Sequence, residues 1–186
     1  FVTGDRVINP RVLEKIPDLD GATKSVSEVF DSEDRLARIQ NLQVRYTAAI
    51  DNDQLEVWPE FFTEDARYRI TTKADFDEGL PLGIIYATSR AMLRDRVTSL
   101  REANIYEGQG YRHVISPPLI NESNTEGVWS ETNFMVARTR HDGDMVLFAA
   151  GRYLDWVVFD GTNSQFAEKI VVIDSSKIDT LLVIPL

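Results

Sequence analysis

The first regular pattern along this chain is helical. Apolar side chains recur there every three or four positions, which is the spacing of an amphipathic helix: Leu36, Ile39, Leu42, Tyr46, Ala49 and Ile50. Asp31 and Ser32 stand before this run as candidate N-caps, and the polar residues 51–53 end it. The pattern predicts a helix over residues 31–51 with one face in the core.

Shorter elements follow, and then a second helix. A helical turn is predicted over residues 55–61, and short strands over residues 66–71 and 83–87. Ser89 is a candidate N-cap for the second helix. The apolar face of that helix would carry Leu93, Val97, Leu100 and Asn104, and another face carries Arg90, Arg94 and Arg101.

After Gly110 the pattern changes to the two-residue alternation of β-strands. Strands are predicted over residues 111–116, 128–140, 145–159 and 164–174, with hairpin turns at 141–144 and 160–161 and an edge or bend at 117–118. Helices followed by a meander of long antiparallel strands indicate the α+β class. Such strands would curve around the N-terminal helices as a cone-shaped antiparallel sheet. This order of elements resembles the nuclear transport factor 2-like (cystatin-like) fold of ketosteroid isomerase and scytalone dehydratase.

Residues 1–30 show neither period. Pro10, Pro17, Gly4 and Gly21 interrupt the apolar positions, which is typical of an irregular segment. We therefore expect an irregular N-terminal arm over residues 1–30 and a single cone-fold domain over residues 31–186. An ordered arm of this composition would lie on its own domain or on a neighbouring chain.

Charge and hydropathy narrow the choice of partners. The 186 residues include 20 basic and 30 acidic side chains, a net charge of −10, whereas nucleic-acid binding requires a basic surface. Apolar stretches such as residues 145–151 are too short to span a bilayer, and the first residues show no signal-peptide pattern. These features predict a soluble cytoplasmic protein with neither nucleic acid nor membrane as a partner.

The chain contains no cysteine and only two histidines, His113 and His141. Without thiolates it cannot hold an iron–sulfur cluster or a thiolate zinc site. An iron site of two histidines and one carboxylate would require both histidines, which lie on different predicted elements. The sequence therefore predicts no metal or cofactor site in this chain.

A few side chains could perform acid–base chemistry. His113 could act as a general base in the cone, although a structural role is favoured. Asp155 and Glu168 lie on neighbouring predicted strands and could form an acid–base pair. The favoured alternative makes them exposed partners of Arg152 and Lys169, because like charges are costly to bury together.

Two further clusters could have a binding role. The aromatic run WPEFF at residues 58–62 could bind a ligand, although core packing is favoured because aromatic rings bury large areas. Arg90, Arg94, Arg96 and Arg101 could grip a carboxylate or a partner chain, although a solvated helix face is favoured. The chain has no GxGxxG, P-loop or GxSxG motif. No pattern establishes a catalytic residue.

Three blocks of sequence resemble the β subunits of Rieske-type aromatic-ring-hydroxylating dioxygenases. The first is AAIDND at 48–53 with WPEFFTEDARYR at 58–69, where a helix with an acidic end leads through a tryptophan to a phenylalanine–threonine–x–aspartate step. The second is MLRDRVTSLREANIY at 92–106 with YRH at 111–113. The third is FAAGRYLD at 148–155 with the closing stretch at 173–186. The nearest likeness is to enzymes acting on aromatic carboxylates such as terephthalate, salicylate or anthranilate.

The resemblance implies a non-catalytic structural subunit in an α3β3 assembly. It places the Rieske [2Fe-2S] cluster and the mononuclear Fe(II) in a partner α subunit, which receives electrons from NAD(P)H through a separate reductase. No catalytic, cofactor-binding or metal residue is implied in this chain. Residues expected to have structural or interface roles are Trp58, Phe61, Phe62, Tyr68, Arg96, Arg112, His113, Tyr153 and Trp156. The alternative is a stand-alone cone-fold isomerase or dehydratase that uses His113 and a buried carboxylate.

Overall fold

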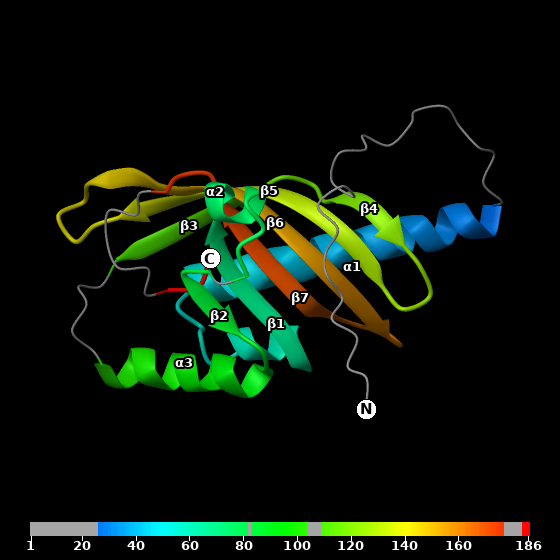
Figure 1. The fold of residues 1–186 in the computed structure, drawn as a ribbon, viewed down its shortest axis with the longest axis horizontal. Coiled ribbons are helices and arrows are strands. Elements are labelled where there is room, and N and C mark those ends of the chain that lie inside the picture. The colour runs from blue at the N-terminus through cyan, green and yellow to red at the C-terminus, as the bar shows by residue number, and fades with distance from the viewer. Residues whose placement is uncertain (1–25, 82, 104–108, 177–183) are drawn as a thin grey trace.

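One long helix, α1 (Val26–Asp51), crosses one face of a strongly curved sheet in the computed structural model (Figure 1). The structure describes residues 26–81, 83–103, 109–176 and 184–186. Ile39, Leu42 and Tyr46 lie on the buried face of α1, as the apolar spacing requires. The helix ends where Asp53 adopts a positive φ of 56°, a conformation that a short polar side chain tolerates.

Seven strands form the sheet in the order β2-β1-β7-β6-β5-β3, and β4 pairs with β5 outside this path. All pairs are antiparallel except β1 with β7, which run parallel. The strands are β1 (Phe62–Thr72), β2 (Ile85–Ala87), β3 (Gly110–Ile115), β4 (Leu119–Ser123), β5 (Val128–Thr139), β6 (Met145–Asp160) and β7 (Asn163–Ile173). The expected α+β class and the cone-shaped curved sheet are confirmed, and the parallel pair makes the sheet mixed.

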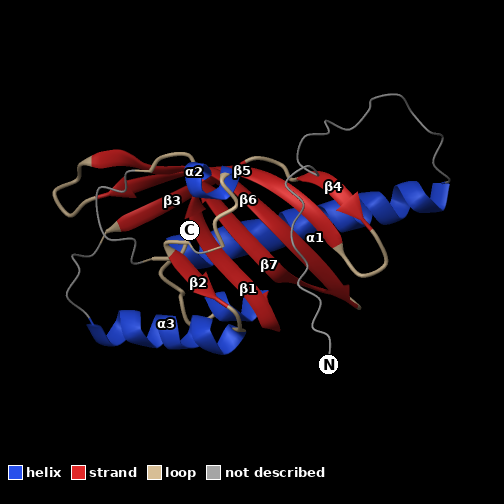
Figure 2. Ribbon diagram, viewed as in Figure 1, coloured by secondary structure: helices blue, strands red, loops and turns tan. Residues whose placement is uncertain are grey.

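Helices cover the two faces of this sheet unequally (Figure 2). The inner face packs against α1, the 3-10 turn η2 (Trp58–Phe61) and α3 (Arg90–Ala103), which share the main apolar core. On the outer face lies only the short helix α2 (Lys73–Asp77) among the described helices, capped by the side chain of Thr72, which accepts a hydrogen bond from the Asp75 amide at 3.1 Å. Phe76 of α2 covers a second apolar cluster, whose members are Leu154, Ile170 and Val172.

The curvature of the sheet has local causes in its longest strands. The β5–β6 pairing shifts register between Val136 and Ala137, and the β6–β7 pairing shifts between Trp156 and Val157. Each such bulge adds an unpaired residue and increases the local twist. The two connecting turns use Gly143 and Gly161, both with positive φ.

The structure also corrects several boundaries. Helix α1 begins at Val26, so Asp31 and Ser32 lie inside it rather than capping it. Neither α2 nor β4 was expected, because each has only five residues and lacks a long period. Asn104 and residues 1–25 lie outside the described residues. None of the helices in the described ranges combines the length and apolar character needed to cross a bilayer.

Candidate functional site

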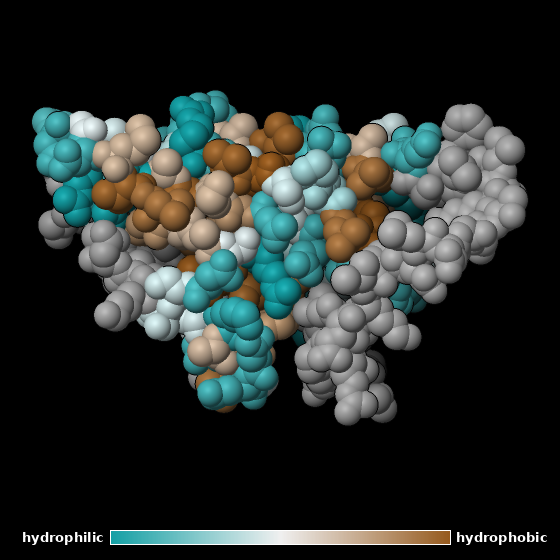
Figure 3. Space-filling model, turned by 90° about the horizontal axis from the view of Figure 1, so that it is seen from above, coloured by the Kyte–Doolittle hydropathy of each residue, from teal (hydrophilic) through white to brown (hydrophobic). Residues whose placement is uncertain are grey.

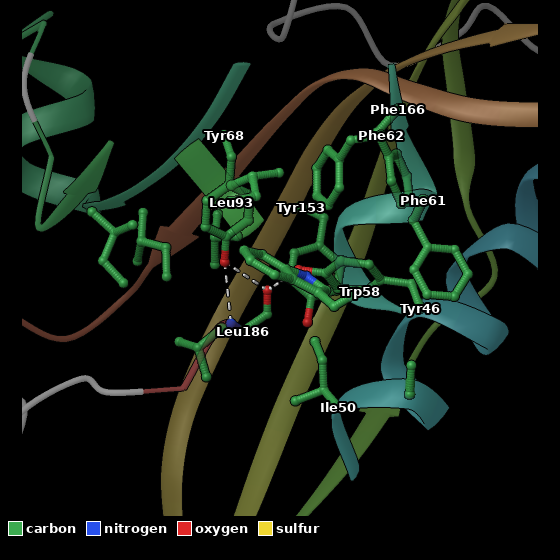
Figure 4. Packing of buried hydrophobic residues seen from close by; sticks show 14 of the residues in the cluster. Tyr46, Ile50, Trp58, Phe61, Phe62, Tyr68, Leu93, Tyr153, Phe166 and Leu186 are labelled. Atoms are coloured by element: carbon green, nitrogen blue, oxygen red, sulfur yellow. Dashed lines mark hydrogen bonds between the residues drawn. The ribbon is translucent and has the colours of Figure 1, made fainter. Parts of the chain in front are cut away.

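Aromatic rings fill the interior of the cone (Figure 4). Tyr46 of α1, Trp58 of η2, Phe62 and Tyr68 of β1 and Phe166 of β7 are each at most 1% exposed. The rings meet edge to face, with centroids 5.2 Å apart for Trp58 and Tyr68 and 5.5 Å apart for Tyr46 and Phe166. This geometry is favourable for aromatic pairs. The space that an open cone would offer to a substrate is occupied by the chain's own side chains.

Residues 184–186 lie against the same rings. The Tyr46 hydroxyl donates a hydrogen bond to the main-chain oxygen of Leu186 at 2.6 Å. The Tyr68 hydroxyl donates to the same oxygen and accepts from the Leu186 amide, both at 3.2 Å. Burial raises the pKa of Tyr68 to about 12, so its hydroxyl keeps the proton that it donates at neutral pH.

A buried ion pair lies beneath helix α1. Lys169 Nζ lies 3.0 Å from Asp155 Oδ1, and both side chains are fully buried. Gln43 donates a hydrogen bond to Asp155 and accepts one from Lys169 at 3.3 Å. Burial lowers the pKa of Lys169 to about 8 and raises that of Asp155. The expectation that Asp155 and Lys169 form an exposed pair is therefore wrong, although they are partners.

A second buried contact joins the end of α1 to strand β3. Asp51 Oδ1 lies 2.6 Å from Nδ1 of His113, and the His113 amide donates to Asp51 Oδ2 at 2.9 Å. A carboxylate at Nδ1 favours the tautomer with its proton on that nitrogen. Nε2 is buried and has no hydrogen-bond partner within the described residues. The imidazole is 0% exposed, so a substrate entering from solvent cannot come within hydrogen-bond reach of it, as a general base requires.

The outer face of β3, β5 and β6 carries exposed apolar side chains. Val114, Met135, Met145 and Leu147 are 57%, 49%, 68% and 66% exposed, and Val114 pairs with Met135 in the sheet. We call these four residues the outer apolar patch. Figure 3, which looks onto this face, shows hydrophobic side chains beside the β5–β6 hairpin. A contiguous patch of this kind usually marks a protein interface.

Three arginines of α3, Arg90, Arg94 and Arg101, are engaged by acidic residues. Arg90 Nη1 lies 2.7 Å from Glu64, and Arg94 Nη2 lies 2.9 Å from Glu60. Arg101 forms ion pairs with Asp53 and Glu56. These ion pairs connect α3 to the end of α1, to η2 and to β1. The expected solvated helix face therefore also has a structural role.

A surface cleft of about 310 Å³ lies outside the cone, between α1 and the turn that joins β6 to β7. Arg38 lies in this cleft but donates to the carbonyl oxygens of Gly161 and Asn163 at 2.9 and 2.7 Å. Its guanidinium also lies over the Phe159 ring, 4.7 Å from the centroid. The polar groups of the cleft therefore hold the turn in place.

The sequence of residues 45–180 matches the family model of the ring-hydroxylating β subunit. The chain belongs to this family. Among its relatives, it is 45% identical over 148 residues to the small subunit of anthranilate 1,2-dioxygenase from Burkholderia cepacia, covering 80% of this chain and 92% of the relative. It is 43% identical over 150 residues to a β subunit of the terephthalate 1,2-dioxygenase oxygenase component from a Comamonas species, covering 80% and 97%.

Solved structures place the β subunit in the same fold. A β subunit attributed to an aromatic-ring-hydroxylating dioxygenase of Novosphingobium aromaticivorans superposes with a TM-score of 0.76 and 29% identity, covering 87% of this chain and all of that chain. The β subunit of benzoate 1,2-dioxygenase from Burkholderia mallei superposes with a TM-score of 0.61 and 16% identity, covering 83% and 93%. The family match favours a dioxygenase subunit over the stand-alone isomerase or dehydratase.

The residues expected to have structural or interface roles lie in several environments. Those buried in the aromatic core are Trp58, Phe61, Phe62, Tyr68 and Tyr153. His113 is held by Asp51, and Trp156 lies beside Trp129 with ring centroids 5.4 Å apart. Arg112 is exposed and Arg96 half-buried, and burial lowers the pKa of Arg96. The structure brings the aromatic members together but leaves Arg112 at the surface.

Sequence reasoning missed two partners in the cone, Gln43 and Leu186, and the burial of Lys169. Gln43 and Lys169 complete the polar group around Asp155, and Leu186 binds the tyrosine hydroxyls. Gln43 lies four positions after Ile39 and three before Tyr46, on the apolar face of the first helix, which is a local signal that it is buried. Nothing local indicates Leu186, because its contact with Tyr46 joins residues 140 positions apart.

Proposed function

We propose that this β subunit is a non-catalytic structural subunit, which supports α subunits that hydroxylate an aromatic ring. The observation that carries the proposal is the packed cone: rings from α1, η2, β1 and β7 occupy the interior. A cone enzyme needs an open cavity in which a substrate meets its acid–base group. The His113 imidazole is 0% exposed and is held by Asp51, so it serves packing rather than turnover.

The oxygenase chemistry is assigned to the partner. The chain has no cysteine for a Rieske cluster, and its described residues contain no group of three or more histidine, aspartate and glutamate side chains that could hold a metal. We place the Rieske [2Fe-2S] cluster and the mononuclear Fe(II) in an α subunit that receives electrons from NAD(P)H through a reductase. This chain contributes shape and contact surface.

We further propose an α3β3 complex in the cytoplasm acting on an aromatic carboxylate. Support for the substrate class comes from the relatives, whose names specify anthranilate and terephthalate. Support for assembly comes from the outer apolar patch, which a monomer would leave in water. The arm expected over residues 1–30 is shortened by α1, which begins at Val26. We propose that residues before α1 form the arm, for which a neighbouring subunit would provide a surface.

Iron content and turnover test this proposal. We expect the isolated chain to bind no stoichiometric iron and to show no oxygenase activity, and the complex with its α subunit to contain iron and turn over. In that complex His113→Ala should weaken stability or assembly and leave the product pattern unchanged. About one tightly held iron per isolated chain, or a normally assembled His113→Ala complex without turnover, would contradict the non-catalytic role.

A further inference from the structure

The mouth of the cone holds residues 184–186 in the way that a pocket holds a ligand (Figure 4). Leu186 is 1% exposed and Ile184 is 7% exposed. The main-chain oxygen of Leu186 accepts hydrogen bonds from the Tyr46 and Tyr68 hydroxyls, and the Leu186 amide donates one to the Tyr68 hydroxyl. One residue thus presents an apolar side chain to the ring-lined wall and an oxygen to two hydroxyl donors.

The same region contains a buried hydroxyl group without a hydrogen-bond partner among the described residues. Tyr153 is 0% exposed, and its hydroxyl has no hydrogen-bond partner among the residues that the structure describes. The ring centroids of Tyr46 and Tyr153 lie 6.3 Å apart, and the Tyr46 and Tyr68 hydroxyls share the Leu186 oxygen, so the three side chains lie close together. A buried polar group without a partner costs free energy, which is characteristic of sites built to receive a polar ligand.

We propose that the cone mouth is a binding pocket for a compact apolar group joined to a carbonyl or carboxylate oxygen, and that residues 184–186 are its ligand within this chain. The rings of Trp58 and Tyr68 provide the apolar wall, and the Tyr46 and Tyr68 hydroxyls bind the oxygen. An external molecule of the same chemistry enters when the segment is absent. The pocket is defined by contacts inside this chain, so the proposal stands independently of the subunit's role in the oxygenase.

Peptide complementation tests the pocket directly. A variant that ends at residue 183 is titrated with acetyl-Ile-Pro-Leu, the chemical equivalent of residues 184–186, by isothermal calorimetry. We expect binding of one peptide per chain and a rise in Tm. The full 186-residue chain, whose pocket is filled, should bind none.

Matched ligands and variants show whether the contacts seen in the structure are responsible. Acetyl-Ile-Pro-Ala lacks the buried leucine methyl groups and should bind at least about 30-fold more weakly. Tyr68→Phe in the shortened chain should lower the affinity for acetyl-Ile-Pro-Leu by about 3- to 10-fold, which corresponds to the loss of a neutral hydrogen bond. Tyr86→Phe is the matched control, because Tyr86 is 46% exposed on β2, and should change nothing.

If the shortened chain does not fold alone, the peptide is added during refolding, and recovery of folded protein supports the pocket. Should it recover none, Leu186→Ala in the full chain decides, because removal of the buried side chain leaves an apolar cavity. A rise in Tm with benzene supports the pocket in that case. A folded shortened chain that binds no peptide, or a Leu186→Ala chain indifferent to benzene after failed rescue, would overturn the proposal.

Discussion

Lys169 and Asp155 place two opposite charges in a region without solvent contact. Removal of a charge from water costs several kcal/mol per ion, and mutual attraction offsets that cost only when the remaining hydrogen bonds are satisfied. Gln43 bonds to both members of the pair, and three aromatic rings surround the ammonium within 5 Å. Loss of one member should therefore destabilise the fold strongly, although the intact group contributes little to net stability.

Removal of one charge should be far more damaging than removal of both. We expect Lys169→Met to lower the free energy of unfolding by about 3–5 kcal/mol, because it leaves the Asp155 carboxylate uncompensated. The double variant Lys169→Met with Asp155→Leu should regain most of that loss in urea unfolding. Arg152→Met is the control, since its contact with Glu131 at 3.5 Å is partly exposed and should cost less than about 1 kcal/mol. Equal losses in the single and double variants would contradict this account.

The buried tyrosines make stability depend on alkaline pH. Burial raises the Tyr68 pKa from 10.0 to about 12, so the folded chain binds this proton more tightly than the unfolded chain does. The stabilisation is fully present below pH 10 and is lost as the pH rises through about 12. We expect the free energy of unfolding to fall over this window, and to fall less steeply in Tyr68→Phe than in Tyr86→Phe. Parallel slopes for these two variants would show that Tyr68 does not contribute.

Among the elements, the long hairpin β5–β6 was the most predictable. Its strands were expected at 128–140 and 145–159, and they occupy Val128–Thr139 and Met145–Asp160. Long runs rich in β-branched and aromatic residues and a glycine in the turn are local signals, so the sequence alone reveals them. The parallel pairing of β1 with β7 has no such signal, because it depends on segments about a hundred positions apart.

Lys169 was expected at the surface because charges are costly to bury, but a bulge in β7 turns it into the cone. Val157 pairs with Phe166, but its neighbour Trp156 pairs with Glu168, so Ala167 is an extra residue in β7. The bulge reverses the alternation, and Phe166 and Lys169 both point into the cone although they are three positions apart. A bulge is set by tertiary packing, so a period counted along the strand could not have placed this side chain.

Strands β6 and β7 approach closely at Gly151. A Cβ at this position would meet the backbone carbonyl of Val172, which cannot move without breaking the ladder of β7. We expect Gly151→Ala to cost about 3 kcal/mol or more in unfolding free energy. Gly110→Ala is the matched control, since the nearest atom to its Cβ would be 3.8 Å away. A stable Gly151→Ala chain would show that the close approach is absent in solution.

For the whole molecule, the sequence predicted the aromatic members of the cone but not what they bind. Trp58, Phe62, Tyr68 and Tyr153 were expected as structural residues, because aromatic side chains are buried in most folds. Their relation to Leu186 depends on the closed cone and could not be read from spacing. The outer apolar patch joins residues of β3, β5 and β6, so it too depends on the folded sheet.

The outer apolar patch should control association between neighbouring copies of this chain. Arg112 lies in the same outward row of β3 as Val114. Each copy carries a net charge of −10, which opposes self-association, so the burial of the apolar side chains must outweigh this repulsion. We expect light scattering to report a mass above the monomer, and Leu147→Lys to lower it. Val44→Lys, at a 51% exposed position on α1, should leave the mass unchanged. A monomeric native chain at micromolar concentration would contradict the association.

The pairing of β1 with β7 also bears on how this chain folds during synthesis. Strand β1 completes its hydrogen bonds only when residues 163–173 are available. The Tyr46 hydroxyl cannot form its hydrogen bond until Leu186 is present. Such non-local contacts slow folding, because the entropy of closing a long loop is lost before the contact forms. A nascent chain released from the ribosome only as far as the β5–β6 hairpin exposes the faces of α1 and β1 that later meet in the core. The cone therefore cannot close before residues 163–186 have been synthesised, and until then its exposed apolar surface makes help from chaperones valuable.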